Sequence, residues 1–462
     1  MYNKNIYIKR REQLKKKVKS GLLLFLGNVD SPMNYTDNIY PFRQDSTFLY
    51  YFGLDHPGFA AIIDIDEYKE IIFGNDLSVD DIVWTGPQKT TVQLAKGVGI
   101  NNTLQTSKLD EIIKSAISSD RKIHFLPQYR AENKITLSAL LGINPQLINN
   151  YSSHELTTAV INQRSIKSKE EVDDIEKAVN VSYDMYTLAM RTAKPGIYER
   201  EVAGLVEGIV LAAGGRLSFP TILSVHGETL HNHYHHNKMK SGEIFVMDSG
   251  AEVSNGYASD ITRTVPVNGK FTSMQKDIYQ IVLKAQMSSI RAIKPGVSYK
   301  NIHLKAAKII AQGLKNLGLM KGNVNDAVAN GAHAMFFPHG LGHMMGLDVH
   351  DMENLGENLV GYEKNVKRSD QFGLAYLRLA RKLEPGFVLT VEPGIYFIPE
   401  LINKWQKEKI NSRFINFNTV NKYRKFGGIR VEDDVLVTKS GHRVLGKPIP
   451  KTIKEVEEYC NK

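Results

Sequence analysis

The sequence predicts a mixed protein of the α+β and α/β classes, with a smaller α/β N-terminal domain at residues 1–165 and a duplicated domain at residues 166–462. Three observations predict this organisation. Helical and strand patterns alternate up to about residue 165. In the remainder, a strand that ends in a carboxylate occurs twice, and a pair of helices also occurs twice. At 462 residues the chain is long enough for two or three domains.

Each copy of the repeated strand ends in an acidic residue. Residues 240–250 and 383–394 each read as an apolar strand that begins after a turn glycine. The carboxylate follows six positions later, at Asp248 after Gly242 and at Glu392 after Gly386. Because a buried charge must be paired or must coordinate a cation, two such strands predict a metal site on a pseudo-twofold axis.

The repeated helices flank a Lys-Pro-Gly turn, found at residues 194–196 and again 100 residues later at 294–296. Proline followed by glycine ends one predicted helix in each copy, and a second helix follows. The tripeptide alone could recur by chance, but its agreement with the carboxylate strands favours a duplicated domain. A solenoid is disfavoured because its repeats are shorter and more numerous. The predicted helices cover residues 170–190, 199–213, 274–290 and 299–317.

The N-terminal domain is predicted to begin with a basic amphipathic helix, followed by a buried strand at residues 21–26. That apolar run is too short for a membrane span and lacks the cleavage site of a signal peptide. Further strands are expected at residues 59–64 and 68–73. The domain boundary is expected near residue 165, where Ser168 is the predicted N-cap of the first long helix and Glu171 is its capping partner.

The composition is that of an ordinary globular protein, with 42% hydrophobic and 23% charged residues. The formal net charge of +10 would suit a nucleic-acid partner, but lysines are spread over the whole chain and no nucleic-acid-binding motif accompanies them. A solvated basic surface is therefore favoured, and we expect neither a nucleic-acid partner nor a membrane partner. The single cysteine, Cys460, allows no intrachain disulfide, which favours a cytoplasmic location.

Five residues beside apolar strands or glycine turns form the predicted metal site: Asp248, Asp260, His343, Glu392 and Glu432. Four carboxylates and one imidazole are an oxygen-rich set that suits Mn²⁺ and accommodates Co²⁺, Fe²⁺ or Zn²⁺. Their negative charge matches two divalent cations, which can activate water when they lie about 4 Å apart. Surface ion pairs would explain any one of these acids, but they explain the whole set less well. A hairpin turn is expected at residues 254–256, between the two aspartates.

Motifs around these residues resemble those of the Xaa-Pro aminopeptidases and Xaa-Pro dipeptidases (prolidases), the pita-bread metallopeptidases. The motifs are Tyr-Ala-Ser-Asp-Ile-Thr-Arg-Thr at 257–264, His-Gly-Leu-Gly-His at 339–343, Leu-Asp-Val-His-Asp at 347–351, Val-Glu-Pro-Gly-Ile-Tyr at 391–396 and Gly-Ile-Arg-Val-Glu-Asp at 428–433. Residues 42–53 look like the signature of that family's N-terminal domain. The resemblance therefore covers nearly the whole chain, and it implies a pita-bread fold for the duplicated domain.

The resemblance implies that the five residues bind two metal ions, usually Mn²⁺. It further implies that Asp260 and Glu432 bridge or chelate the ions and that Glu392 takes the proton from the attacking water. Arg430 would orient an acidic ligand, and Tyr396 would lie near the substrate. The implied reaction is hydrolysis of the bond between a peptide's first residue and a following proline.

The resemblance also implies catalytic histidines in the substrate pocket, namely His339 and His350. A third is expected seventeen residues before the first metal-binding aspartate, which matches His231 and leaves His233 as the reserve. If residues 230–236 formed a strand, His231, His233 and His235 would share one face and could bind an independent zinc ion. That site is disfavoured because no carboxylate is adjacent.

Several functional alternatives stay open. A dipeptidase would need a cation for the free carboxylate of its substrate, and Arg378, fourteen residues before Glu392, is a candidate. The insert at residues 401–423 is also prolidase-like, although the aminopeptidase is the expectation. The complete ligand set disfavours a non-catalytic pita-bread binding module and a creatinase-like hydrolase. The large N-terminal domain disfavours a methionine aminopeptidase. The resemblance further implies a homodimer or higher homo-oligomer, formed partly through the N-terminal domain.

Overall fold

The structure, a computed structural model, describes residues 1–462 apart from the side chain of residue 254. One side chain of the hairpin turn predicted at residues 254–256 therefore lies outside the described residues. The chain divides into two units. The N-terminal unit comprises Met1–Arg164 and Met352–Gly356, and the C-terminal unit comprises Ser165–Asp351 and Glu357–Lys462.

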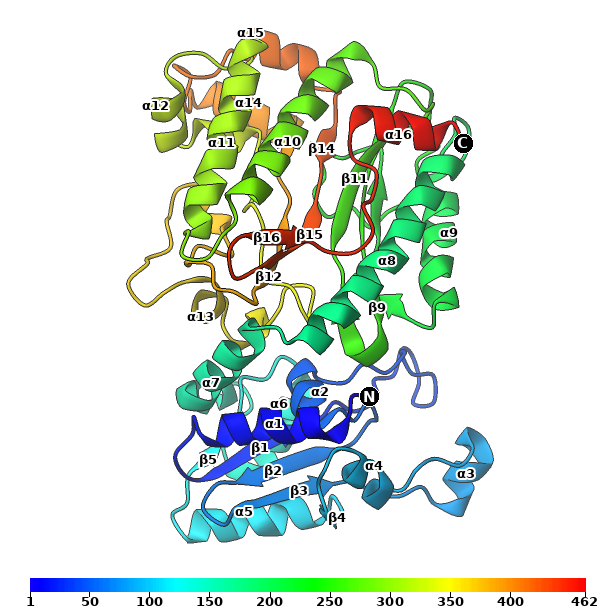
Figure 1. The fold of residues 1–462 in the computed structure, drawn as a ribbon, viewed down its shortest axis with the longest axis vertical. Coiled ribbons are helices and arrows are strands. Elements are labelled where there is room, and N and C mark those ends of the chain that lie inside the picture. The colour runs from blue at the N-terminus through cyan, green and yellow to red at the C-terminus, as the bar shows by residue number, and fades with distance from the viewer. The chain divides into compact units, whose positions relative to one another are not determined.

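A five-stranded sheet with the order β4-β3-β2-β1-β5 forms the centre of the N-terminal unit (Figure 1). The strands β1, β2 and β3 are antiparallel neighbours, whereas β4 and β5 pair in parallel at the two edges. Every residue of β1 and β2 is buried, as expected for strands covered on both faces. The strands predicted in this unit are confirmed; the observed bounds are β1 Leu22–Leu26, β2 Ala60–Asp64, β3 Lys69–Phe73, β4 Asn102–Leu104 and β5 Ile123–His124.

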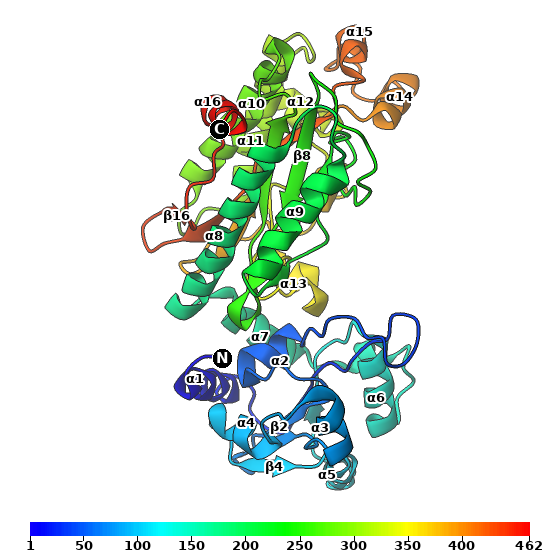
Figure 2. The ribbon, with the colours of Figure 1, turned by 90° about the vertical axis from the view of Figure 1, so that its right-hand side faces the viewer.

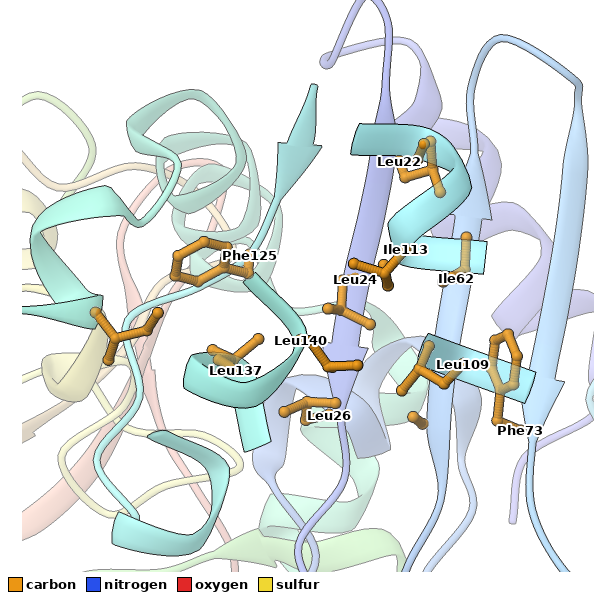
Figure 3. Close-up of a cluster of buried hydrophobic side chains, with 13 residues drawn as sticks. Leu22, Leu24, Leu26, Ile62, Phe73, Leu109, Ile113, Phe125, Leu137 and Leu140 are labelled. Carbon is orange, nitrogen blue, oxygen red and sulfur yellow. The ribbon is translucent and has the colours of Figure 1, made fainter. Parts of the chain in front are cut away.

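The core of the N-terminal unit lies on both faces of this sheet. Leu22, Leu24 and Leu26 alternate along β1 and belong to one cluster with side chains of α5 and α6 (Figure 3). Phe25 points to the opposite face and packs against Phe52 of α2, with ring centroids 5.4 Å apart. The helices of this part of the chain are α1 Lys4–Lys15, α2 Ser46–Phe52, α3 Val79–Thr85, α4 Thr91–Gly97, α5 Lys108–Ser118, α6 Ala131–Leu141 and α7 His154–Ser165.

Two pairs of helices in the C-terminal unit confirm the predicted helical repeat, with ends within two residues of those expected. Ser168 and Glu171 form the predicted capping box at the start of α8. The turn glycines Gly196 and Gly296 have φ angles of 99° and 81°, a region that favours glycine. Figure 2 shows α8 and α9 side by side. The bounds are α8 Lys169–Thr192, α9 Glu199–Ala212, α10 Ser273–Ala292 and α11 Tyr299–Asn316.

The two halves of this unit also repeat their backbone contacts. The N–H of Gly196 donates to the carbonyl of Met239 at 2.9 Å, and the N–H of Gly296 donates to the carbonyl of Leu383 at 2.8 Å. In each half the accepting segment leads into the strand that carries the repeated carboxylate. The sequence repeat is therefore a structural repeat.

The strands of the C-terminal unit form small sheets that meet between the two halves. Their orders are β11-β8-β7, β10-β9-β6, β12-β15-β16 and β13-β14. The halves join where the N–H of Glu432 donates to the carbonyl of Thr262 at 3.0 Å. The bounds are β6 Arg216–Leu217, β7 Ile222–Ser224, β8 Ile244–Ser249, β9 Ala251–Val253, β10 Tyr257–Ala258, β11 Ile261–Pro266, β12 Val388–Val391, β13 Gly394–Tyr396, β14 Gly428–Arg430, β15 Asp433–Val437 and β16 His442–Val444.

Two further stretches of the chain lie near the repeated elements. Residues 230–237 form turns and a loop, so the strand on which the disfavoured zinc site depended is not formed. The stretch from 354 to 370 includes the short helix α13 Glu357–Gly361. The other helices are α12 Val324–Ala329, α14 Pro399–Lys407, α15 Phe417–Val420 and α16 Ile453–Cys460. Among the described residues, no helix combines the length and apolarity that crossing a membrane requires.

Candidate metal centre

The five predicted ligands come together at the ends of strands from both halves of the C-terminal unit. Asp248 lies on β8, Asp260 immediately precedes β11, Glu392 immediately follows β12, and Glu432 lies between β14 and β15. His343 lies on a loop that is bonded to β12. All five line one cavity of about 870 Å³. Strand pairing between the two halves therefore brings together residues far apart in the sequence.

The ligand atoms are close enough to share a cation. Nε2 of His343 lies 3.3 Å from Oδ2 of Asp260 and 3.9 Å from Oε1 of Glu392. One ligand atom each from Asp260, His343 and Glu432 falls within 4.8 Å of the other two. These three residues are buried, so water does not screen the carboxylates from one another.

Orphaned oxygens test whether the residues fit a metal. Oδ1 of Asp248, Oδ1 of Asp260 and Oε1 of Glu432 are buried, and none has a hydrogen-bond partner among the described residues. Buried carboxylate oxygens are rarely left without a partner, because their desolvation costs free energy. Three such oxygens in one cavity fit divalent cations.

The orientation of His343 gives a second, independent test. Its Nδ1 lies 3.0 Å from the carbonyl of Met344, which can only accept a hydrogen bond, so the neutral ring carries its hydrogen on Nδ1. The lone pair of Nε2 then faces the carboxylates of Asp260 and Glu392. Acceptors that face one another need a proton or a metal cation between them, and imidazole nitrogen is a common metal ligand.

Burial and mutual repulsion raise the pKa values of Asp260, Glu392 and Glu432. Burial raises the pKa of Glu392 to about 7, with His343 and Arg430 opposing the shift. The pKa values of Asp260 and Glu432 are raised well above their usual range, mainly by burial and then by neighbouring carboxylates. Divalent cations among these groups would reverse this effect and keep them ionised.

Arg430 connects one ligand to the cavity wall. Its Nη2 donates to Oδ2 of Asp248, and its Nη1 donates to the hydroxyl of Tyr396 at 2.8 Å. That hydroxyl lies 2.8 Å from Nε2 of His339, whose Nδ1 faces the carbonyl of Gly340 at 2.7 Å. Since a carbonyl only accepts, Nδ1 carries the hydrogen and Tyr396 donates to Nε2. Burial lowers the pKa of His339 to about 3, which keeps the ring neutral.

The other predicted histidines also line the cavity. The ring of His350 lies 4.1 Å from that of His343, centroid to centroid. His231 and His233 line the cavity from the loop before β8. The pKa of His231 is lowered, first by burial and then by Arg430. His235 turns away from this group, with its Nδ1 at 3.0 Å from the carbonyl of Leu223.

Sequence reasoning missed two residues that hold the ligands. Oγ1 of Thr262 donates to Oε2 of Glu432 at 2.6 Å. The same Oγ1 accepts a hydrogen bond from Nε of Arg430 at 3.1 Å. Asp434 accepts a hydrogen bond from the backbone N–H of Asp260 at 3.0 Å. The sequence carries a signal for Thr262, which lies two positions after the predicted ligand Asp260. Side chains two positions apart share one face of an extended segment. The sequence carries no such signal for Asp434, since its contact with Asp260 joins the two halves of the unit.

The outer wall of the cavity carries charged side chains. Glu357 pairs with Arg368 and lies 3.4 Å from Nη1 of Arg378. All three line the cavity together with Lys404 of α14. A second hollow of about 1080 Å³, between α10, α11 and α12, has lysines, amides and one carboxylate, Asp277, in its described lining. It therefore lacks the ligand set of the first cavity.

Comparison with known proteins identifies the family. A model described as metallopeptidase family M24 matches residues 173–439, and one described as aminopeptidase P, N-terminal domain, matches residues 7–124. Human Xaa-Pro dipeptidase is 33% identical, over 96% of this chain and 90% of its own length.

Solved structures agree with this family and with the predicted fold. Aminopeptidase P from Escherichia coli, solved with the inhibitor Pro-Leu, matches 100% of this chain and 98% of its own with a TM-score of 0.81 and 28% identity. Aminopeptidase PepP of Pseudomonas aeruginosa matches the same shares with a TM-score of 0.83 and 27% identity. The pita-bread fold with a preceding α/β domain is thereby confirmed. The chain belongs to metallopeptidase family M24, whose enzymes use divalent metal ions, and is a proline-specific Xaa-Pro peptidase.

Proposed function

We propose that the chain is a two-metal exopeptidase that removes the first residue from peptides with proline in second place, an Xaa-Pro aminopeptidase. The observation that carries the proposal is the buried group of four carboxylates and one imidazole, three of whose oxygens have no partner among the described residues. Residues 166–462 would form the catalytic domain and residues 1–165 the N-terminal domain.

Asp248, Asp260, His343, Glu392 and Glu432 would hold two divalent ions. Mn²⁺ suits this oxygen-rich set best, and Co²⁺, Fe²⁺ and Zn²⁺ are the alternatives. The ions, when bound, would supply an activated water molecule and stabilise negative charge on the scissile carbonyl. Asp260 and Glu432, the most enclosed carboxylates of the set, are the residues proposed to bridge or chelate the ions.

Glu392 is the proposed general base. Its side chain is 19% exposed, more than those of the other ligands, so it can reach a water molecule in the cavity. In this role Glu392 takes the proton from the attacking water and returns it to the proline nitrogen as the bond breaks. Without this proton the proline nitrogen would have to leave as an amide anion, so proton transfer accompanies release of the proline.

The histidines and Arg430 are proposed to act around the same cavity. His339 is neutral and directs its Nδ1 hydrogen to the carbonyl of Gly340, so its proposed role is to line the substrate pocket beside Glu392. His350 and His231 can donate hydrogen bonds to the scissile carbonyl and to the charge that develops on it. Arg430 orients the carboxylate of Asp248 through its hydrogen bond.

A second candidate function is the Xaa-Pro dipeptidase. Arg378 lines the cavity and could bind the free carboxylate of a dipeptide, and the human relative carries that name. Rates for an Xaa-Pro dipeptide and for an Xaa-Pro-Yaa tripeptide with the same first residue separate the two activities. We expect a higher kcat/KM for the tripeptide. Hydrolysis of the dipeptide alone would replace the aminopeptidase by the dipeptidase.

Release of the first amino acid from a proline-second peptide, measured with and without Mn²⁺, tests the proposal directly. Glu392→Ala should lower kcat by about 10²-fold or more, because the base is removed. Hydrolysis that needs no metal, or that survives in Glu392→Ala, would contradict it. A chain that binds no metal and cleaves no peptide would instead be a non-catalytic binding module.

Location and assembly complete the proposal. The single cysteine, Cys460, is buried, in keeping with a cytoplasmic protein. Assembly into a homodimer or higher homo-oligomer would involve the N-terminal domain, where the short helix α3 exposes apolar side chains. The substrate would be the peptide alone, without nucleic acid or membrane.

A further inference from the structure

The loop that carries His231 and His233, residues 225–237, is closed at its base. Its first end follows β7, and its second end leads toward β8. Both ends are bonded to the start of α9, where the N–H of Glu199 donates to the carbonyl of Asn237 at 3.0 Å. We call residues 225–237 the histidine loop.

The carboxylate of Glu199 forms the centre of this closure. Glu199 is fully buried, although it is an acidic residue at the first position of a helix. Its Oε1 accepts from Oγ of Ser224 at 3.0 Å and from the N–H of Val225 at 2.8 Å. Its Oε2 accepts from the backbone N–H and from Nδ2 of Asn237, at 3.1 and 3.0 Å. One side chain thus holds both ends of the histidine loop.

A second step connects this closure to His231 itself. Nδ2 of Asn232 donates to Oγ of Ser224 at 3.1 Å, and the hydroxyl of Ser224 in turn donates a hydrogen bond to Glu199. Asn232 also accepts from the N–H of Tyr234 at 3.0 Å. Asn232 follows His231 directly, so the position of His231 depends on a continuous hydrogen-bonded path that begins at Glu199.

The other half of the duplication has an equivalent. Tyr299 occupies the position 100 residues after Glu199, at the first position of α11, and is also fully buried. Its hydroxyl donates to the carbonyl of Thr390 at 2.6 Å, on the strand to which the loop with His343 is bonded. Each half therefore uses the same helix position to support the segment that brings a histidine to the cavity.

We infer that Glu199 is a positioning residue, which holds the histidine loop so that His231 faces the scissile bond. This role rests on the proposed peptidase function. Glu199 lies outside the cavity lining and acts only through the loop. A displacement of a catalytic group by about 1 Å can lower a rate by about 10²-fold, so the support of a loop matters to catalysis.

The isosteric variant Glu199→Gln tests the support itself. Its amide can present an oxygen to only one end of the loop, so an NH₂ group meets the N–H donors of the other end. Hydrogen exchange should become faster at the amides of Val225 or Asn237. The control is Glu201→Gln, which removes an exposed carboxylate of the same helix that caps the N–H of Tyr198 at 2.7 Å. Unchanged protection in Glu199→Gln would overturn the inference, whether or not the chain cleaves peptides.

A double-mutant cycle then separates positioning from general stability. With Mn²⁺ and a proline-second tripeptide, Glu199→Gln should lower kcat by about 10- to 100-fold. In a His231→Ala background it should lower kcat no further, because the group that it positions is gone. Effects that multiply would overturn the inference while leaving the proposed peptidase function intact.

Two further variants keep the test decisive. The exchange Glu199→Gln with Asn237→Asp restores one hydrogen bond with donor and acceptor reversed, so it should recover part of the lost kcat. If Glu199→Gln does not fold, Asn237→Ala removes the side-chain contact at one end of the loop and should show the same dependence on His231. Absence of any peptidase activity in the wild-type chain would reject the proposed function, and exchange at Val225 and Asn237 would still decide the role of Glu199.

Discussion

Thr262 illustrates how a single hydroxyl can govern a ligand. It donates to Oε2 of Glu432 at 2.6 Å and accepts from Arg430, so it fixes one oxygen and leaves Oε1 turned to the other ligands. Thr262→Val should weaken Mn²⁺ binding by about 10- to 100-fold, as expected for loss of a group that orients a metal ligand. Isothermal titration of the metal-free protein with Mn²⁺ measures the change.

The control for that variant is Thr157→Val in the N-terminal unit. Thr157 is 2% exposed, and its hydroxyl has no hydrogen-bond partner among the described residues. Its replacement should leave Mn²⁺ affinity unchanged. Equal affinity in Thr262→Val and the wild type would show that the hydroxyl does not orient Glu432.

Two buried histidines predict a pH dependence of stability. His303 of α11 and His333 are fully buried with ring centroids 6.3 Å apart, and their ring nitrogens have no hydrogen-bond partners among the described residues. Burial lowers their pKa values to about 3 and about 4. Between about pH 6.5 and pH 4 the unfolded chain therefore binds more protons than the folded chain, so stability falls as the pH falls.

Each histidine should contribute a slope of about 1.4 kcal/mol per pH unit in that window. His303→Phe should reduce the slope by about that amount, measured by denaturant unfolding at about pH 6 and about pH 5. His154→Gln, which changes an exposed histidine of α7, should leave it unchanged. An identical slope in His303→Phe and the wild type would refute the assignment.

At the scale of elements, a buried ion pair fixes the segment that leads into α8. Nζ of Lys167 lies 2.7 Å from Oδ2 of Asp351, and both side chains are 1% exposed. Asp351→Ala leaves a buried ammonium without this carboxylate and should lower the free energy of unfolding by about 3–5 kcal/mol. Denaturant unfolding at neutral pH gives the value.

An exposed pair on α8 provides the matched control. Lys169 and Asp173 are 2.6 Å apart, but their side chains are 84% and 45% exposed. Asp173→Ala should cost less than about 1 kcal/mol, because solvent screens the pair. Similar losses in the two variants would show that burial does not set the strength of the Lys167 pair.

The elements themselves were largely predictable. Proline and glycine after Lys194 and Lys294 locate two helix ends, and Ser168 with Glu171 locates a helix start, because these signals act within a few residues. The loop at residues 230–237 was not predictable, since an alternation of histidines does not indicate which strand, if any, would pair with this segment. The side chain of Glu199, from another element, organises that segment as a loop.

At the scale of the whole molecule, assembly is the testable feature. The helix α3 has no buried residue, and Val79, Val83 and Trp84 are 77%, 73% and 86% exposed. Such a patch on one helix is typical of an interface. Trp84→Glu should weaken the proposed homodimer by about tenfold or more, since buried tryptophans often dominate interface energies. Sedimentation at several protein concentrations measures the dissociation constant.

Tyr68→Glu is the control for assembly. Tyr68 is 87% exposed in the turn between β2 and β3, away from α3 in the sequence. Its replacement should leave the dimer intact. A monomeric wild-type chain, or a dimer that tolerates Trp84→Glu, would contradict assembly through α3.

The sequence by itself determined the two domains' fold class, the duplication and the identities of the five candidate ligands. Turn, cap and strand signals are local, and repeated carboxylates at the ends of apolar strands are visible without coordinates. The motif resemblance added the peptidase family, which the comparisons confirm. Catalytic roles for single residues stay proposals.

Only the tertiary structure decided which groups support those ligands. Thr262 meets Glu432 across 170 residues, Arg430 meets Asp248 across 182, and Asp434 meets the backbone of Asp260 across 174. These contacts arise where sheets from the two halves meet, and no local pattern encodes the partner. A hydrogen bond requires a defined distance and direction, which only packing of distant segments can set.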